Sequence, residues 1–518
     1  MSPEEQGVFR GFLTSFDSRG ERFNSKSVKL LDLLCSSHGN ISDHEVEFYV
    51  YGKRATMAFS RLLIRFRDKL VESLLLDVNV KREGAYSEQF RYLFEVRKKI
   101  CCAQIFVGRG LYEIALFLYD TAAETSGKYE FYEELLQVLR LKMQLAALTQ
   151  GKEEFQRIMR EYRKYEACQA AAFAAYCDYN LLVGETVFKG RQEDHGRFLL
   201  QSISRMRRDY QETGSANVAF YLYYLEAQHF QELHFFRHAR KSLMKLAALV
   251  EKFPAVHVPY RLGNVLINLA DNDLFLHQFD RAVETCSRAR PLLKTGSYNE
   301  FQCMETEFYG HYYSGRYDHA RMLLLELLES DNEKNASFRH GKRQYLLACT
   351  LFMQGEYKEV HELLAEHNEI ERDREGWNVG IRILSIMNDL ERALNDSAGK
   401  KIENARKHLR KLEQQEKLRR REQLIYEVLR ELDNRSYDFK AVHQSLAGHF
   451  EALRSNDGEN CWQVRSPEMI IFHEWFLAHV IRIKYVQKTP KYTEPVGLVM
   501  PVNGPASFLP EGEDGVTI

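Results

Sequence analysis

The sequence predicts an all-α fold of stacked helical hairpins, and two observations support this prediction. First, a three-part pattern recurs: a small residue, an aromatic residue nine positions later, and a second small residue three further on. The clearest copies are Ala103, Tyr112 and Ala115; Ala227, Phe236 and Ala239; Ala270, Phe279 and Ala282; and Ala348, Tyr357 and Val360. Second, only three prolines lie between Pro3 and Pro467, and runs of alternating apolar residues are few. A period of about forty residues with this composition indicates a helical solenoid.

Weaker copies of the pattern fill the gaps between the clear ones. They are Ala146, Phe155 and Ile158; Ala393, Ile402 and Ala405; Gly315, Tyr317 and Ala320; and the fragment Gly196 and Phe198. The central positions of all copies follow one another at intervals of 38 to 45 residues. The repeat is therefore expected to continue through most of the chain.

Each part of the pattern has a physical role in a helical hairpin. The first small residue lets two helices approach closely, and the aromatic residue packs between them. A glycine two positions before the aromatic residue can end the first helix, because glycine adopts the left-handed conformation at little cost. Such glycines are Gly110, Gly196, Gly315 and Gly355. One hairpin cannot bury its own apolar face, so neighbouring hairpins must stack on it.

The runs from Gly110 to Ala115, from Gly315 to Ala320 and from Gly355 to Val360 resemble the turn of a tetratricopeptide repeat. The resemblance covers roughly residues 90 to 450. The period here is about forty residues rather than about 34, and the proline that usually closes each repeat is missing. The resemblance implies a right-handed superhelix whose first helices line a concave face that binds a protein or peptide.

Residues 1–85 lack the repeat and are expected to form a separate helical module. Three helices are expected there, at about 27–37, 42–51 and 56–70. Ser42 and Glu45 have the spacing of a capping box, which marks the start of the second helix.

Basic residues gather around the third of these helices. They are Lys53, Arg54, Arg61, Arg65 and Lys69. The last three recur every four residues and so share one side of a helix. The order of helices, loop and turn resembles the helix-turn-helix part of bacterial regulators that join such a domain to tetratricopeptide repeats. That resemblance implies DNA contact by the third helix, with the five basic residues as candidates. The alternative is a helical cap whose basic side faces solvent.

The expected domains are therefore residues 1–85, a repeat solenoid at 86–484, and a proline-rich tail at 485–518. Five of the ten prolines lie in that tail. It is expected to be flexible, or else to act as a docking peptide for a partner or for another copy. A last helix, at about 469–485, is expected to cap the solenoid.

Composition favours no particular partner, since the formal net charge is −1. Nine cysteines without a C-x-x-C pair indicate core residues in a reducing compartment. The N-terminus lacks the pattern of a signal peptide and no apolar run has the length of a membrane span, so we expect a cytoplasmic protein without membrane contact.

No catalytic or metal-binding pattern is complete. His229, His234 and His238 lack a suitable carboxylate, and His473-Glu474 is followed by a histidine at the wrong spacing for a zinc protease. No phosphate-binding, nucleophile-elbow or dinucleotide-binding motif is present. The charged stretch 400–423 is expected to be a solvated helix, or else to contact phosphates or an acidic partner.

The preferred hypothesis is a non-enzymatic scaffold or adaptor without cofactor that binds a protein or peptide partner. The second hypothesis is a transcriptional regulator that contacts DNA with residues 25–75 and senses a partner with its repeats. The third is an enzyme subunit whose active site comes from another chain. The sequence does not decide among the three.

Overall fold

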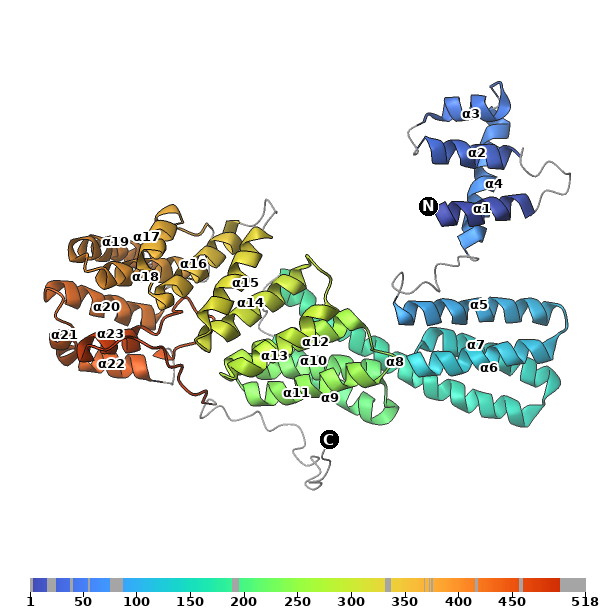
Figure 1. The fold of residues 1–518 in the computed structure, drawn as a ribbon. Coiled ribbons are helices and arrows are strands. Elements are labelled where there is room, and N and C mark those ends of the chain that lie inside the picture. Colours follow the sequence, from blue (N-terminus) through green and yellow to red (C-terminus); the bar gives the residue numbers. More distant parts are fainter. Residues whose placement is uncertain are drawn as a thin grey trace. The chain divides into compact units, whose positions relative to one another are not determined.

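The computed structural model describes residues 3–15, 25–37, 41–54, 56–74, 87–188, 195–330, 337–367, 369–371, 373, 376–414, 418–455 and 460–493. Within these ranges every regular element is a helix and no strand occurs. Most helices are joined in pairs by turns of a few residues (Figure 1). The predicted fold class, an all-α fold of stacked helical hairpins, is confirmed. The handedness of the superhelix stays a prediction.

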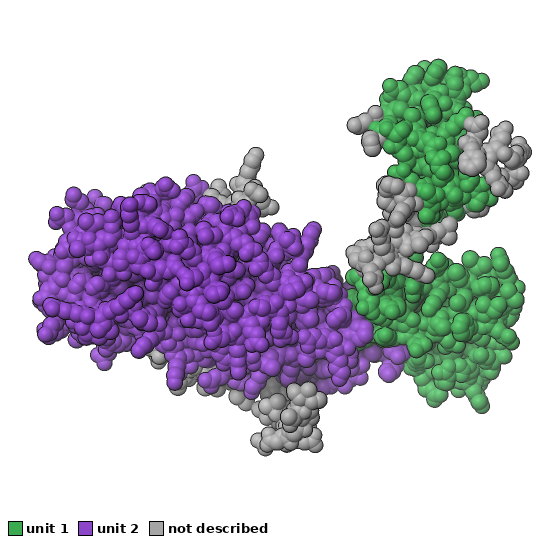
Figure 2. All heavy atoms as spheres, in the orientation of Figure 1, with its two compact units in different colours: residues 1–162 green, residues 163–518 purple. Residues whose placement is uncertain are grey.

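The chain divides into two compact units, residues 1–162 and 163–518 (Figure 2). The boundary falls inside a helix of 37 residues, α8 (Lys152–Phe188). The other helices of unit 1 are α1 (Pro3–Ser15), α2 (Lys26–Ser36), α3 (Asp43–Tyr51), α4 (Thr56–Leu74), α5 (Glu88–Gly108), α6 (Tyr112–Tyr129) and α7 (Tyr132–Thr149).

Helices α1 to α4 share a small apolar core of their own. Phe9 of α1 packs edge-on against Phe66 of α4, with ring centroids 5.2 Å apart. The capping box at Ser42 is present: the Glu45 amide donates to the Ser42 hydroxyl, and the Glu45 carboxylate accepts from the Ser42 amide at 3.0 Å. The sequence predicts three helices in this module and the structure has four. Helix α1 belongs to it because Phe9 and Leu13, four residues apart, complete the core.

Unit 2 begins with the rest of α8 and with α9 (His195–Thr213), and continues as stacked hairpins around one continuous core. The hairpins are α10 (Ala216–Glu232) with α11 (Phe236–Lys252), α12 (Pro259–Phe275) with α13 (Phe279–Ala289), α14 (Tyr298–Tyr313) with α15 (Tyr317–Glu329), α16 (Ser337–Gln354) with α17 (Tyr357–Glu366), and α18 (Trp377–Glu391) with α19 (Asn395–Gln414). The last helices are α20 (Arg420–Asn434), α21 (Phe439–Ser445), α22 (Ala447–Arg454) and α23 (Phe472–Ile481).

The hairpins close with one recurring turn. A residue with positive φ stands two positions before the second helix, and the next amide donates to the carbonyl five residues earlier; examples are Arg316 to His311 and Gln278 to Asp273. This is the Schellman arrangement, which satisfies carbonyls at a helix end. Glycine supplies the positive φ at Gly110, Gly315 and Gly355, while His234, His277 and Ala393 supply it without glycine. The turn therefore recurs more often than the glycines suggest.

The predicted aromatic residues mostly begin the second helix of a hairpin. Those that do are Tyr112, Phe236, Phe279, Tyr317 and Tyr357. In the hairpin that Tyr112 belongs to, the small residue three positions after the aromatic residue, Ala115, is fully buried. The pattern thus marks where each second helix starts and packs.

The pattern is misplaced around α8 and α9. Gly196 is the second residue of α9, so it does not end a helix, and Phe198 lies in the same helix rather than at the start of a second one. Phe155 lies three residues inside α8. One uninterrupted helix of 37 residues, α8, occupies most of this interval, and the next helix begins at His195, so the short-hairpin spacing does not apply here.

A buried asparagine joins neighbouring hairpins at two places in unit 2. The Asn272 side-chain amide donates to the carbonyl of Phe236, the first residue of α11, at 3.0 Å. The Asn388 amide donates in the same way to the carbonyl of Tyr357, the first residue of α17, at 3.0 Å. Each bond ties a first helix to the start of the preceding second helix.

Candidate functional site

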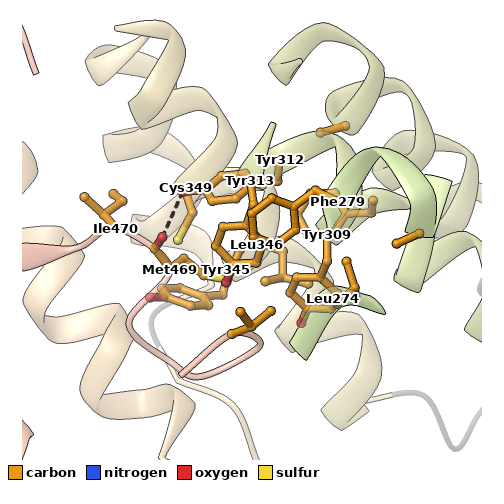
Figure 3. Packing of buried hydrophobic residues seen from close by; sticks show 14 of the residues in the cluster. Leu274, Phe279, Tyr309, Tyr312, Tyr313, Tyr345, Leu346, Cys349, Met469 and Ile470 are labelled. Carbon is orange, nitrogen blue, oxygen red and sulfur yellow. Dashed lines mark hydrogen bonds between the residues drawn. The ribbon is translucent and has the colours of Figure 1, made fainter. Parts of the chain in front are cut away.

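The first helices of the unit 2 hairpins carry a segment of the chain itself. Residues 460–471, named here the C-terminal loop, lie against α14, α16 and α18. The Tyr345 hydroxyl donates to the carbonyl of Pro467 at 2.5 Å, and the Tyr312 hydroxyl donates to that of Met469 at 3.4 Å. Figure 3 shows Tyr312, Tyr313 and Tyr345 gathered beside Met469 and Ile470. The resemblance to tetratricopeptide repeats implies that a partner binds the first helices of the hairpins. At α14, α16 and α18, the chain's own C-terminal loop lies on these helices.

A charged side chain anchors the C-terminal loop. Arg465 has a side chain only 20% exposed, pairs with Asp271 of α12 and lies 3.9 Å from Glu305 of α14. Its guanidinium also lies 5.1 Å from the ring centroid of Tyr309. Burial alone would lower the pKa of Arg465, but the nearby carboxylates, Asp271 foremost, outweigh it and raise the pKa. The loop is thus held by a paired charge as well as by apolar packing.

The backbone of the loop approaches α18 very closely. A Cβ atom on Gly380 would lie 2.6 Å from the carbonyl oxygen of Pro467 and 2.6 Å from the Tyr345 hydroxyl. Only glycine leaves room for this contact at the observed positions.

A second extended segment follows α23. Residues 483–493, named here the strap, leave α23 after Arg482, which has a φ of +57°, and run back toward the earlier hairpins (Figure 1, red trace). The amide of Ile471 donates to the Gln487 side-chain oxygen at 3.3 Å, and the amide of Lys488 donates to the Glu474 carboxylate at 3.1 Å. These bonds fix the first half of the strap to the C-terminal loop and to α23.

The second half of the strap meets the turns of two hairpins. The His277 Nδ1 atom donates to the carbonyl of Pro490, and the Tyr492 hydroxyl donates to the carbonyl of His234 at 2.7 Å. The amide of Phe236, at the start of α11, donates to the same hydroxyl at 3.4 Å. Burial lowers the pKa of His277, so its ring is neutral at pH 7.

Tyr492 is also held by rings and by a cation. Its ring centroid lies 5.7 Å from that of Phe236 and 6.4 Å from that of His277. The Arg237 guanidinium lies 5.9 Å from the Tyr492 centroid, within the range of a cation–π contact. We name the surface formed by His234, Phe236, Arg237 and His277 the turn surface.

The strap alternates between its two sides. The half-buried positions are Tyr485, Gln487, Thr489, Pro490 and Tyr492, and the exposed ones are Ile483, Lys484, Val486, Lys488, Lys491 and Thr493. The alternation shifts by one residue between Thr489 and Pro490. This period of two is typical of an extended chain with one face on a surface. The same pattern can be seen in the sequence, where it indicates an extended segment at the start of the predicted tail. Residues 494–518 lie outside the described part of the chain.

A cavity of about 480 Å³ lies between α18, the start of α20 and the C-terminal loop. On its wall Arg421 donates to the Glu468 carboxylate at 2.9 Å and to the carbonyl of Asn460 at 2.6 Å. Burial raises the pKa of Glu422, on the same wall, to about 7. The cavity therefore has a carboxyl group that changes charge near neutral pH.

The predicted nucleic-acid residues lie together in unit 1. Arg61 and Arg65 are exposed on α4, Lys53 and Arg54 are exposed in the turn before it, and Lys69 is half-buried. The exposed face of α4 is mixed rather than basic. Asp68 and Glu72 share it with the two arginines, and so do the apolar side chains Met57, Ile64 and Val71.

The charged stretch 400–423 forms α19 and the start of α20, with residues 415–417 outside the described ranges. Part of its charge is used internally: Lys401 pairs with the buried Asp389 at 2.7 Å, and Arg406 pairs with Glu403 at 2.9 Å. Lys400, Lys407, Arg410 and Lys411 are exposed.

The part of the chain with described coordinates holds no group of three or more His, Cys, Asp or Glu side chains placed to bind a metal ion. Within that part, no helix combines the length and the apolar character that crossing a membrane requires.

Comparison with known proteins gives little. No family model matches the chain, and no curated protein matches it. Among solved structures, it is similar to a signal transduction ATPase with numerous domains and a tetratricopeptide repeat sensor from Pyrococcus horikoshii, with 15% identity and a TM-score of 0.35. The match covers 78% of this chain and 52% of the other, so the chain spans about half the length of that protein.

Proposed function

We propose that this chain is a non-enzymatic scaffold or adaptor that binds a protein or peptide partner on its helical repeats. The observation that carries the proposal is the strap: eleven residues of extended chain, 483–493, lie along successive hairpins of unit 2. They are held through a main-chain carbonyl, which any extended peptide can present, and through a tyrosine side chain, which a partner peptide can also carry.

The test is purification of the tagged chain from its host, with and without nuclease. We expect one or two proteins to remain bound after nuclease treatment. They should be lost when the repeats are altered by Phe236→Ala together with Tyr317→Ala, and retained by Lys407→Ala, which changes an exposed side chain of α19. If the parent, the double variant and Lys407→Ala all recovered the same proteins, the partner would not bind through the repeats, and the proposal would fail on this point.

The second candidate function is that of a DNA-associated regulator. The observation that favours it is the arrangement of α3 and α4: a capped helix, a turn with Gly52 at a φ of +70°, and a following helix with Arg61 and Arg65 exposed on one side. Asp68 and Glu72 on the same side weaken this candidate, because their negatively charged carboxylates repel the phosphates of DNA.

Duplex DNA binding measured over a range of salt concentrations tests this candidate. A regulator should lose affinity steeply as salt rises, because each neutralised phosphate releases counterions. The double variant Arg61→Glu with Arg65→Glu should then abolish binding while α1–α4 stay folded. Equal binding by the double variant and the parent would exclude DNA contact at these residues.

A further inference from the structure

We infer that the turn surface is a docking site for extended peptides that carry a proline two residues before a tyrosine, and that the strap occupies it in the same chain. The inference deepens the proposed scaffold function and rests on it. Pro490 and Tyr492 of the strap show which groups a bound peptide would present to the turn surface. A partner peptide must displace the strap before it can bind there.

The turn surface recognises the tyrosine in three ways. The hydroxyl donates to the carbonyl of His234 and accepts from the amide of Phe236, so a phenylalanine would leave both groups without this partner. The ring lies between aromatic neighbours and beneath the Arg237 guanidinium. Together these contacts select a tyrosine over other side chains of similar size.

The proline position is read through the main chain. His277 donates to the carbonyl of Pro490, a contact that any residue could make. Proline favours the extended conformation that places this carbonyl and the next-but-one side chain on the same surface, and so lowers the entropy lost on binding. The surface therefore prefers a Pro-x-Tyr segment and leaves the middle residue free, as the exposure of Lys491 shows.

Only the inward side of the strap is specified. Lys484, Lys488 and Lys491 point away from the hairpins and are exposed. A partner segment needs the equivalents of Pro490 and Tyr492 and not the lysines. Its sequence outside the tyrosine and proline positions can vary.

The strap covers the surface because it is tethered. A segment joined through a short connection has an effective concentration in the millimolar range, so a free peptide of equal intrinsic affinity binds poorly while the strap is in place. A variant that weakens the strap should therefore open the surface without changing it. Tyr492→Ala has this property, because all four side chains of the turn surface remain.

The experiment measures the fluorescence anisotropy of a labelled peptide with the sequence of residues 483–493, titrated with full-length chains. We expect the Tyr492→Ala chain to bind this peptide at least tenfold more tightly than the parent chain. A peptide carrying Tyr492→Ala should bind neither chain, and a peptide carrying Lys491→Ala should bind like the unaltered one. Adding Arg237→Ala to the Tyr492→Ala chain should weaken binding again.

Three outcomes would overturn the inference. One is equal binding of the peptide by the parent and Tyr492→Ala chains. Another is no binding by either chain while both remain folded, which would make the strap a fixed part of the fold. The third is a dimer of the parent chain at high concentration that disappears with Tyr492→Ala, since the occupant would then be the strap of a second copy. If a host partner is still captured in any of these cases, the scaffold function stands without this docking site.

Discussion

The carbonyl oxygen of Pro467 lies 2.6 Å from the position that a Cβ atom on Gly380 would occupy. This contact joins the C-terminal loop to α18, two segments almost ninety residues apart in the sequence. A substitution at Gly380 therefore tests how closely the C-terminal loop packs against α18.

Gly380→Ala is expected to lower the free energy of unfolding of unit 2 by roughly 1 to 3 kcal/mol, as overpacked positions do. The matched control is Gly448→Ala on α22, where an added Cβ would meet nothing within 4 Å. That change should stabilise its helix by up to about 1 kcal/mol. All three tryptophans, Trp377, Trp462 and Trp475, lie in unit 2, so denaturation followed by tryptophan fluorescence reports this unit alone. Equal effects of the two changes would contradict the close approach.

Arg465 offers a test of the buried charge. Arg465→Met would leave Asp271 without its cation, while Glu305 keeps its pair with Lys342, and should cost roughly 3 kcal/mol of stability. The control is Arg435→Met, which breaks a solvent-accessible pair with Glu431 and should cost much less stability than Arg465→Met. Both values come from the same fluorescence-monitored unfolding. A small effect at Arg465 would show that the loop is held by its apolar packing and its other hydrogen bonds, without need of this buried cation.

The recurring turn predicts opposite effects for two exchanges between glycine and alanine. Ala393 has a φ of +56°, a conformation that costs an L-residue about 1 kcal/mol or more, so Ala393→Gly should raise stability by roughly 0.5 to 1 kcal/mol. Gly355, with a φ of +86°, has no atoms within 4 Å of an added Cβ, so Gly355→Ala should lower stability through backbone strain alone. If both changes shift the unfolding midpoint in the same direction, the shared turn geometry is not what determines stability there.

Glu422 predicts a dependence of stability on pH. Its pKa is about 7 in the folded chain, against 4.5 for the ordinary carboxyl group. Since the folded chain holds the proton more tightly, its stability should fall as pH rises from about 4.5 to 7, by at most about 3 kcal/mol. Glu422→Gln should remove this fall and be more stable than the parent at pH 8, because the uncharged amide is buried at no ionic cost. Parallel pH profiles for parent and variant would show that Glu422 is charged at neutral pH.

The sequence predicts the hairpins well because their signal is local. An aromatic residue such as Phe279 begins a helix two positions after a left-handed residue, and this relationship needs no distant partner. The prediction is wrong where the signal is only spacing: Gly196 fits the period, yet it is the second residue of α9, which begins only after the 37-residue α8 has ended at Phe188.

The covered surface could not be predicted in the same way. The contact of Tyr345 with Pro467 joins residues 122 positions apart, and that of His234 with Tyr492 joins residues 258 positions apart. Neither pair has a spacing that a helix or a turn would impose. The local signal in the strap is limited to Lys484-Tyr485, Gln487-Lys488 and Pro490-Lys491-Tyr492, where a lysine stands next to a less polar or uncharged residue; it indicates an extended chain but not the surface beneath it.

Amide hydrogen exchange on the parent chain and on Tyr492→Ala tests the central claim, that the repeats hold the strap as a bound peptide. The account predicts at least tenfold faster exchange at residues 483–493 and at the Phe236 amide in the variant, with unchanged exchange in the interiors of α12, α14 and α16. Unchanged exchange in the strap, or faster exchange throughout unit 2, would contradict it: the first would show that Tyr492 does not hold the strap, and the second that the strap is part of the core.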